Sequence, residues 1–335
     1  MKQKSLSILL LNMLLGMFVT TASAYDIEVP NADGVMIYYV WQNDGTELAV
    51  SYGGKNVIMG KNNYAGDVVI PESVVYEGNT YPVTGIASSA FSECPALTSV
   101  TVPNGVTSIG NSAFYGCTGL TSVTLPNSVT TIGSFAFFAC YALTSVTIPN
   151  SVTTIEESTF QQCVRLTSIT LGSSVESVET FAFSGCNNLK SLTFHCPVVN
   201  GEWFPQQVKE VVIGSEVQSF VERSFGGYGG LANVYLLQEQ PYEIAIQVFS
   251  RNTYDLGTLH VPVGTKELYK QTAGWNRFVN IEEDAPTGIN AAHCVKAAEE
   301  AARYTMDGRH LSKPQPGVNI VRMTDGTTKK VIVKK

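Results

Sequence analysis

Apolar side chains recur at a fixed interval through the middle of the chain. Phenylalanine repeats every 23 residues, and a cysteine follows each phenylalanine three positions later. The pairs are Phe91 and Cys94, Phe114 and Cys117, Phe137 and Cys140, Phe160 and Cys163, and Phe183 and Cys186. A unit this short cannot bury its own apolar side chains, so stacked copies must share one continuous core. The pattern therefore predicts a repeat solenoid.

Further apolar columns run beside the phenylalanines with the same period. They are Leu97, Leu120, Leu143, Leu166 and Leu189; Val100, Val123, Val146, Ile169 and Leu192; Val102, Leu125, Ile148, Leu171 and Phe194; Val106, Val129, Val152, Val175 and Val198; and Ile109, Ile132, Ile155 and Val178. Each column is a candidate row of the shared core.

Each unit predicts a strand, a turn and a short helical piece. Residues 97–102 alternate apolar and polar side chains and are rich in β-branched residues, which indicates a strand with Val100 and Val102 facing inward. Proline ends this strand in three units, at Pro103, Pro126 and Pro149. The three-residue spacing of phenylalanine and cysteine fits one helical or 3₁₀ turn. We expect strands of successive units to pair in parallel, giving an α/β solenoid with one sheet along its inner side.

One family resemblance rests on these units. The segment Ile109-Gly110-Asn111-Ser112-Ala113-Phe114-Tyr115-Gly116-Cys117, continued to Val129, resembles the BspA-like leucine-rich repeat. Clean copies extend from about Ile86 to Phe194. The resemblance implies a surface or secreted protein of the kind found in Bacteroidota, a group of proteins that includes adhesins for host extracellular-matrix proteins.

Weaker copies continue toward the C-terminus. They place Val211, Ile213, Val217, Phe220, Phe225, Leu231, Val234 and Leu236 at the same offsets, with Tyr228 at the cysteine position. One unit near Trp203 and Phe204 is shortened, which leaves the register between Phe194 and Val211 open. After a terminal copy at 259–262, the aromatic residues of 269–281 resemble the end cap of the same family.

The chain divides into four parts. Residues 1–24 read as a secretory signal peptide, with Lys2 and Lys4, an apolar run and the cleavage site Ala22-Ser23-Ala24. Residues 25–82 predict a β-rich N-terminal cap with a first degenerate repeat, and residues 83–285 the repeat array with its C-terminal cap. Residues 286–335 predict a linker and a short β tail.

The tail has more than one interpretation. It resembles the C-terminal β tails of Bacteroidota proteins, some of which are sorting signals for the type IX route. On that interpretation we expect the tail to be removed and the mature protein to be attached to the surface. A small β module or a basic disordered end explains the same composition.

Charge is sparse and its balance is negative. Charged residues make up 15% of the chain, and none occurs between Cys94 and Ile155. The net charge of −7 becomes −9 once Lys2 and Lys4 leave with the signal peptide. No basic face is left for phosphates, which argues against nucleic acid and anionic membrane surfaces as partners. No later segment reaches the roughly 18 apolar residues of a membrane-spanning helix.

Chemistry-bearing residues are scattered, so we expect neither an enzyme nor a metal or cofactor site. The histidines, His195, His260, His293 and His310, lack a nucleophile or carboxylate at a recognisable spacing. The acidic runs 156–157 and 282–284 fit a solvated face better than an acid/base pair. The periodic cysteines fit buried free thiols, while Cys196 and Cys294 stay undetermined.

Two polar rows flank the inward strand positions and form the candidate binding face. They are Ser99, Ser122, Ser145, Ser168 and Ser191, and Thr101, Thr124, Thr147, Thr170 and Thr193. Such hydroxyls suit either simple solvent cover or a lattice for an extended extracellular partner, a host matrix or surface protein or else a glycan. A rival patch is Tyr115, Phe138 and Tyr141 on the other side. A spacer or assembly module without a small ligand is the alternative to a binding scaffold.

Overall fold

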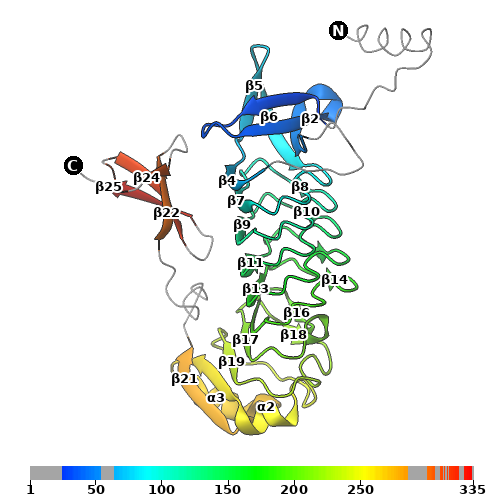
Figure 1. The fold of residues 1–335 in the computed structure, drawn as a ribbon. Helices are drawn as coiled ribbons and strands as arrows, with labels where there is room; N and C mark the ends of the chain where they lie inside the picture. Colours follow the sequence, from blue (N-terminus) through cyan, green and yellow to red (C-terminus); the bar gives the residue numbers. More distant parts are fainter. Residues whose placement is uncertain are drawn as a thin grey trace, which may run out of the picture.

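The computed structural model describes residues 25–53, 64–285, 300–305, 310–311, 313, 315, 317–323 and 328–333. The expected signal peptide, His293 and Cys294 lie outside the described residues. The described array is a solenoid of parallel strands, as the 23-residue period predicts, and Figure 1 shows its elongated coil.

The main strands follow one another along one side of the coil (Figure 1). They are β4 (Gly66–Val69), β7 (Leu97–Thr101), β9 (Ser122–Thr124), β11 (Ser145–Thr147), β13 (Ser168–Leu171), β15 (Ser191–Phe194), β17 (Glu210–Ile213), β19 (Asn233–Leu236), β20 (Thr258–Pro262) and β21 (Asn280–Ala285). All neighbouring pairs are parallel, in one sheet from β4 to β9 and a second from β11 to β21. The expected single sheet is therefore divided between β9 and β11.

A second series of short strands, which the sequence analysis did not predict, lies on the other side of the coil (Figure 1). It begins at β6 (Asn79–Ile86), and its next four members carry the column of Ile109, Ile132, Ile155 and Val178. They are β8 (Ser108–Ile109), β10 (Thr131–Ile132), β12 (Thr154–Ile155), β14 (Ser177–Val178), β16 (Val198–Val199) and β18 (Ser219–Phe220). Each coil thus contributes apolar side chains to the core from two strands, one of the main sheet and one of the second series.

The segment between each phenylalanine and its cysteine is not the expected helical piece. Its backbone forms turns in which alternate amides bond to the next coil, as from Phe114 N to Ala136 O at 2.7 Å. The intervening amides close four-residue turns, as from Cys117 N to Phe114 O at 3.2 Å. Gly116, between Phe114 and Cys117, lies at φ 68°, and Ser112 just before the segment lies at φ 56°, so both are outside the helical region. A helix would satisfy these amides within one unit, whereas here they hold neighbouring units together.

The core is a continuous stack of rings. Phe91, Phe114, Phe137 and Phe160 are fully buried, and successive rings lie 5.0, 5.0 and 5.3 Å apart between centroids and almost parallel. The ring spacing matches the roughly 4.8 Å between paired strands. The backbone repeat therefore sets the ring repeat.

Both ends of the stack are closed by aromatic side chains. At the N-terminal end, β1 (Ile27–Pro30), β2 (Met36–Gln42) and β3 (Glu47–Ser51) form the expected β-rich cap, and β5 (Ser73–Tyr76) pairs with β6. Tyr64 covers Phe91 at 4.6 Å between ring centroids. The C-terminal end consists of α2 (Arg251–Leu256), α3 (Lys266–Gln271) and the 3₁₀ turn Trp275–Arg277. Trp275, the first residue of this turn, is fully buried. Its Nε1 donates to Tyr242 O at 2.8 Å.

The shortened unit keeps its register. Leu192 pairs with Val211 and Phe194 with Ile213, although only 19 positions separate Ser191 from its partner Glu210. The stack continues through Phe204, whose ring lies 4.6 Å from that of Phe183. The tail contributes a separate antiparallel sheet of β22 (Glu300–Thr305), β23 (His310–Leu311), β24 (Gly317–Met323) and β25 (Thr328–Val333).

Candidate functional site

The ten predicted serines and threonines, here called the hydroxyl face, lie at matching positions of β7, β9, β11, β13 and β15. Ser168 pairs with Ser145 on one side and Ser191 on the other, and Thr170 likewise lies between Thr147 and Thr193. The same register joins β7 and β9. The structure therefore places both predicted rows in register, across β7 and β9 in one sheet and across β11, β13 and β15 in the other.

Exposure varies along these rows. Thr147 is exposed, Ser99 is buried, and the other eight are half-buried. The ends of the serine row meet carboxylates, because Ser99 Oγ donates to Asp67 and Ser191 Oγ donates to Glu210 Oε1 at 3.2 Å. Between these ends the residues of the face carry no formal charge. A partner approaching the centre of the face meets hydroxyls and methyl groups.

A neighbouring threonine column has a structural role. Thr121 Oγ1 donates to Thr98 O at 3.0 Å, and Thr167 Oγ1 donates to Thr144 O at 3.0 Å. These hydroxyls are committed to the preceding coil. Within the described residues, the structure gives no comparable side-chain bond for Thr147, Thr170 or Thr193. Thr147, Thr170 and Thr193 are therefore not tied to the preceding coil in this way.

The C-terminal end of the same face has different chemistry. Tyr235 and His260 occupy the threonine position of β19 and β20, and their rings stack 4.3 Å apart. His260 Nδ1 lies 2.7 Å from Asp284 Oδ1, and its Nε2 lies 3.1 Å from Asn233 Oδ1. Glu282 is the strand partner of His260. This end gathers an imidazole, two carboxylates and an amide.

Sequence reasoning missed this group. The interpretation of His260 as a histidine without a carboxylate partner is wrong, although residues 282–284 are exposed as expected. The repeat could have revealed the neighbourhood of His260 and Glu282, since the two residues hold equivalent strand positions in successive units. The contact of Asp284 depends on an irregularity in β21 that the period does not reveal.

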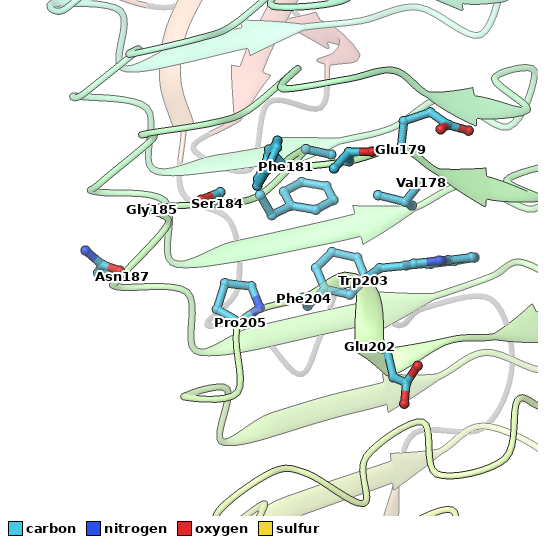
Figure 2. A pocket seen from close by; sticks show the side chains of 13 residues that line it. Val178, Glu179, Phe181, Ser184, Gly185, Asn187, Glu202, Trp203, Phe204 and Pro205 are labelled. Atoms are coloured by element: carbon cyan, nitrogen blue, oxygen red, sulfur yellow. The ribbon is translucent and has the colours of Figure 1, made fainter.

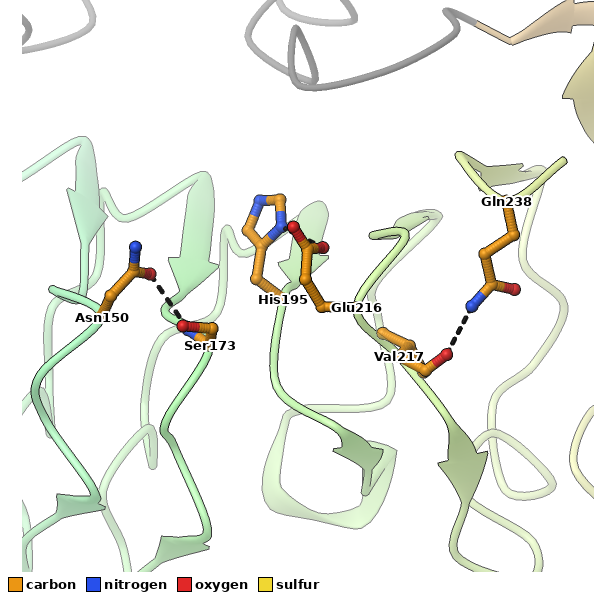
Figure 3. Close-up of polar contacts among 6 residues, drawn as sticks. All are labelled: Asn150, Ser173, His195, Glu216, Val217 and Gln238. Carbon is orange, nitrogen blue, oxygen red and sulfur yellow. Dashed lines mark hydrogen bonds and ion pairs between the residues drawn. The ribbon is translucent and has the colours of Figure 1, made fainter.

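The loop edge beyond the main strands is held by side-chain contacts (Figure 3). Asn150 Oδ1 accepts from Ser173 N at 3.0 Å, and Gln238 Nε2 donates to Val217 O. His195 Nδ1 lies 3.2 Å from Glu216 Oε2. Partial burial raises the pKa of Glu216, but the hydrogen bond with His195 and a backbone donor outweigh it, so the pKa is lowered overall. These bonds join successive coils and so serve stability.

The shortened unit leaves a hollow on the turn side of the coil (Figure 2). Phe181 is 59% exposed beside it, and Trp203, Glu179 and Glu202 also line it. In this unit Gln207 Nε2 donates to Cys186 O at 3.0 Å and so joins the coil to the preceding one. The hollow is thus a consequence of four fewer residues in one coil.

The rival aromatic patch also forms. The rings of Tyr115 and Phe138 stack 5.0 Å apart and are half-buried, while Tyr141 is 45% exposed. They lie on the turn segments next to the buried phenylalanines. The molecule therefore offers two different surfaces in the same repeats, one of hydroxyls and one of rings.

The five periodic cysteines are here called the ladder cysteines: Cys94, Cys117, Cys140, Cys163 and Cys186. All five are buried free thiols, and Cys196 is buried and free as well. Burial raises the pKa of Cys186 to about 12 and that of Cys196 to about 11. Burial also raises the pKa of Cys140 and Cys163 well above the ordinary thiol value. Because the thiolate is the reactive form, these side chains act as core rather than as nucleophiles.

Parallel strands, a phenylalanine stack and closed aromatic ends define a leucine-rich-repeat solenoid. Residues 84–206 match the family model of the BspA type Leucine rich repeat region, in six copies. No curated protein matches the chain. Within the described part of the chain, no helix has the length and apolar character needed to span a bilayer.

Several solved structures are similar to the chain. A leucine-rich repeat protein of T. pallidum is 24% identical with a TM-score of 0.44, over 59% of this chain and 83% of that one. A leucine-rich repeat protein from Bacteroides ovatus is 22% identical with a TM-score of 0.43, over 78% and 77%. One from Bacteroides capillosus is 29% identical with a TM-score of 0.32, over 46% and 99%.

Proposed function

We propose that the protein is a non-catalytic scaffold, secreted or held at the cell surface, that binds an extracellular protein through the hydroxyl face. The observation that carries this proposal is the register of the face, which repeats the same two hydroxyls on every strand from β7 to β15. A repeated surface of this kind suits an extended partner, because many weak contacts add up along it.

The chemistry of the face favours a protein over a glycan. None of its ten side chains is aromatic, so sugar rings have no stacking platform there. Hydroxyl groups both donate and accept, and therefore match the alternating groups of a polypeptide backbone. The BspA-type repeat supports a role in protein interaction, and the predicted signal peptide supports export. An adhesin for host matrix or surface proteins is the specific form of this proposal.

The test compares two variants of the exported chain. One replaces Ser122, Thr124, Ser145 and Thr147 by lysine, which leaves the inward columns intact. The other replaces Tyr115, Phe138 and Tyr141 by serine in the same repeats. Binding is measured on a panel of purified extracellular-matrix proteins and on a printed glycan array, and circular dichroism checks the fold.

We expect the lysine variant to lose binding to a matrix protein by at least a hundredfold, because each buried charge lacks a partner. The serine variant should bind as the wild type does. Loss only in the serine variant would move the site to the aromatic patch. A wild-type chain that binds neither panel would favour the spacer role, for which a uniform polar face is sufficient.

A further inference from the structure

An irregularity in the last strand pair turns a carboxylate toward His260. His260 pairs with Glu282 in β20 and β21, and the register shifts between Val261 and Pro262, so that Pro262 pairs with Ala285. Asp284 is the extra residue of this bulge. Bulges re-aim side chains, and here the Asp284 carboxylate comes within 2.7 Å of His260 Nδ1.

The second ring nitrogen of His260 is held by a neighbouring strand. Its Nε2 lies 3.1 Å from Oδ1 of Asn233, which belongs to β19. Together with the contact between Nδ1 and Asp284, this contact fixes the orientation of the imidazole ring.

Three possible metal ligands lie close together at this end of the sheet. One ligand atom each from His260, Glu282 and Asp284 lies within 4.8 Å of the others. His260 is 7% exposed, and the stacked Tyr235 ring covers its plane, while both carboxylates are exposed. The imidazole is thus held in place by its surroundings, and the carboxylates are free to rotate onto a cation entering from solvent.

We infer that His260, Glu282 and Asp284 form a binding site for a divalent transition-metal cation of the zinc class at the C-terminal end of the hydroxyl face. Zinc takes imidazole nitrogen and carboxylate oxygen at about 2.0–2.2 Å, and three protein ligands leave a position open to solvent. The two carboxylates balance its charge. Asn233 supplies the outer hydrogen bond that metal-bound imidazoles usually make.

The three ligands favour a zinc-class cation over calcium and magnesium. Calcium prefers six to eight oxygens and magnesium keeps most of its water, so a single imidazole with two carboxylates suits neither. Imidazole sites favour zinc, copper and nickel among divalent ions. Zinc is the natural probe because it is redox-inert and so does not oxidise the free thiols of the chain, whose described members are buried.

The experiment titrates zinc chloride into the mature chain by isothermal calorimetry at pH 7.5. The chain carries no polyhistidine tag and carries Cys294→Ser, which removes a thiol outside the described residues. Glu282→Gln and Asp284→Asn test the exposed ligands without disturbing the core, and Asn233→Ala tests the outer hydrogen bond. His195→Asn is the matched control, because His195 is also paired with a carboxylate.

We expect one equivalent of zinc to bind, and both carboxylate variants to weaken binding at least tenfold. Asn233→Ala should weaken it about 10- to 100-fold, as outer-sphere changes do. His195→Asn should have no effect. The inference is overturned by a wild-type chain that takes up no zinc, by unchanged affinity in Glu282→Gln and Asp284→Asn, or by equally tight binding of calcium.

Discussion

The thiol of Cys117 donates a hydrogen bond to the carbonyl oxygen of Phe91, with 2.9 Å between Sγ and O. The same bond recurs at 3.2 Å in the next three units, from Cys140 to Phe114, from Cys163 to Phe137 and from Cys186 to Phe160. Each cysteine thus ties its own coil to the preceding one. The 23-residue period of cysteine reflects this contact between coils rather than disulfide pairing.

The first prediction concerns thiol access. All five ladder cysteines are fully buried, so alkylation of the folded protein with iodoacetamide should leave them unmodified. In denaturant all five should react within minutes, because thiol reactivity follows exposure and thiolate content. Intact-mass spectrometry measures both states. A mass that shows disulfides between ladder cysteines would rule out this account of the core.

The second prediction concerns alkaline pH. Burial raises the pKa of Cys186 from 9.0 to about 12, so the folded state favours the neutral thiol. The contribution of the neutral Cys186 thiol to the free energy of unfolding is fully present below pH 9 and is lost as the pH rises toward 12. Between pH 9 and 10 this thiol should lower the free energy of unfolding by about 1 kcal/mol.

Denaturant unfolding at a series of pH values checks the second prediction. Cys186→Ser has a hydroxyl that does not titrate in this range, so its stability should fall less steeply with pH than that of the wild type. Equal slopes for the two proteins would show that the thiol does not contribute.

The third prediction concerns the ring stack. Phe137 is fully buried, with Phe114 at 5.0 Å and Phe160 at 5.3 Å, so Phe137→Ala opens a cavity shared by three coils. The cost should be about 3–5 kcal/mol of unfolding free energy. Phe138→Ala is the matched control, because this neighbouring ring is half-buried and should cost clearly less. Equal losses, or wild-type stability of Phe137→Ala, would contradict the placement of Phe137 in the stack.

The inward columns could be predicted from the sequence because burial leaves a strict period, with the exception of Val198, which was expected in the column of Val106 and is 45% exposed. The 23-residue spacing was enough to place Phe137, Cys140 and Val146 in one core and the serine and threonine rows on one face. The end cap around Trp275 also followed from its resemblance to known caps. These features depend on which side chains are apolar, and the sequence states that directly.

Backbone detail could not be predicted in the same way. The three-residue spacing of Phe114 and Cys117 fits a helical turn equally well, and only the bonds to the next coil decide against it. The hollow beside Trp203 depends on where a short coil loses its residues. The contact between His260 and Asp284 depends on a bulge. Each is set by pairing between coils, which local propensity does not encode.

A bulky label on a single position of the hydroxyl face tests the central claim most directly. Thr147 is the exposed member of that face and Tyr141 is exposed on the aromatic patch, while the ladder thiols are buried. Thr147→Cys and Tyr141→Cys, each made with Cys294→Ser, therefore accept a polyethylene-glycol maleimide at one chosen site.

Binding is then measured on the matrix protein retained by the wild-type chain, before and after labelling. The account predicts that both unlabelled variants bind as the wild type does, that the label at Thr147→Cys abolishes binding, and that the label at Tyr141→Cys leaves it unchanged. Full binding by the labelled Thr147→Cys variant, with binding lost by the labelled Tyr141→Cys variant, would contradict it.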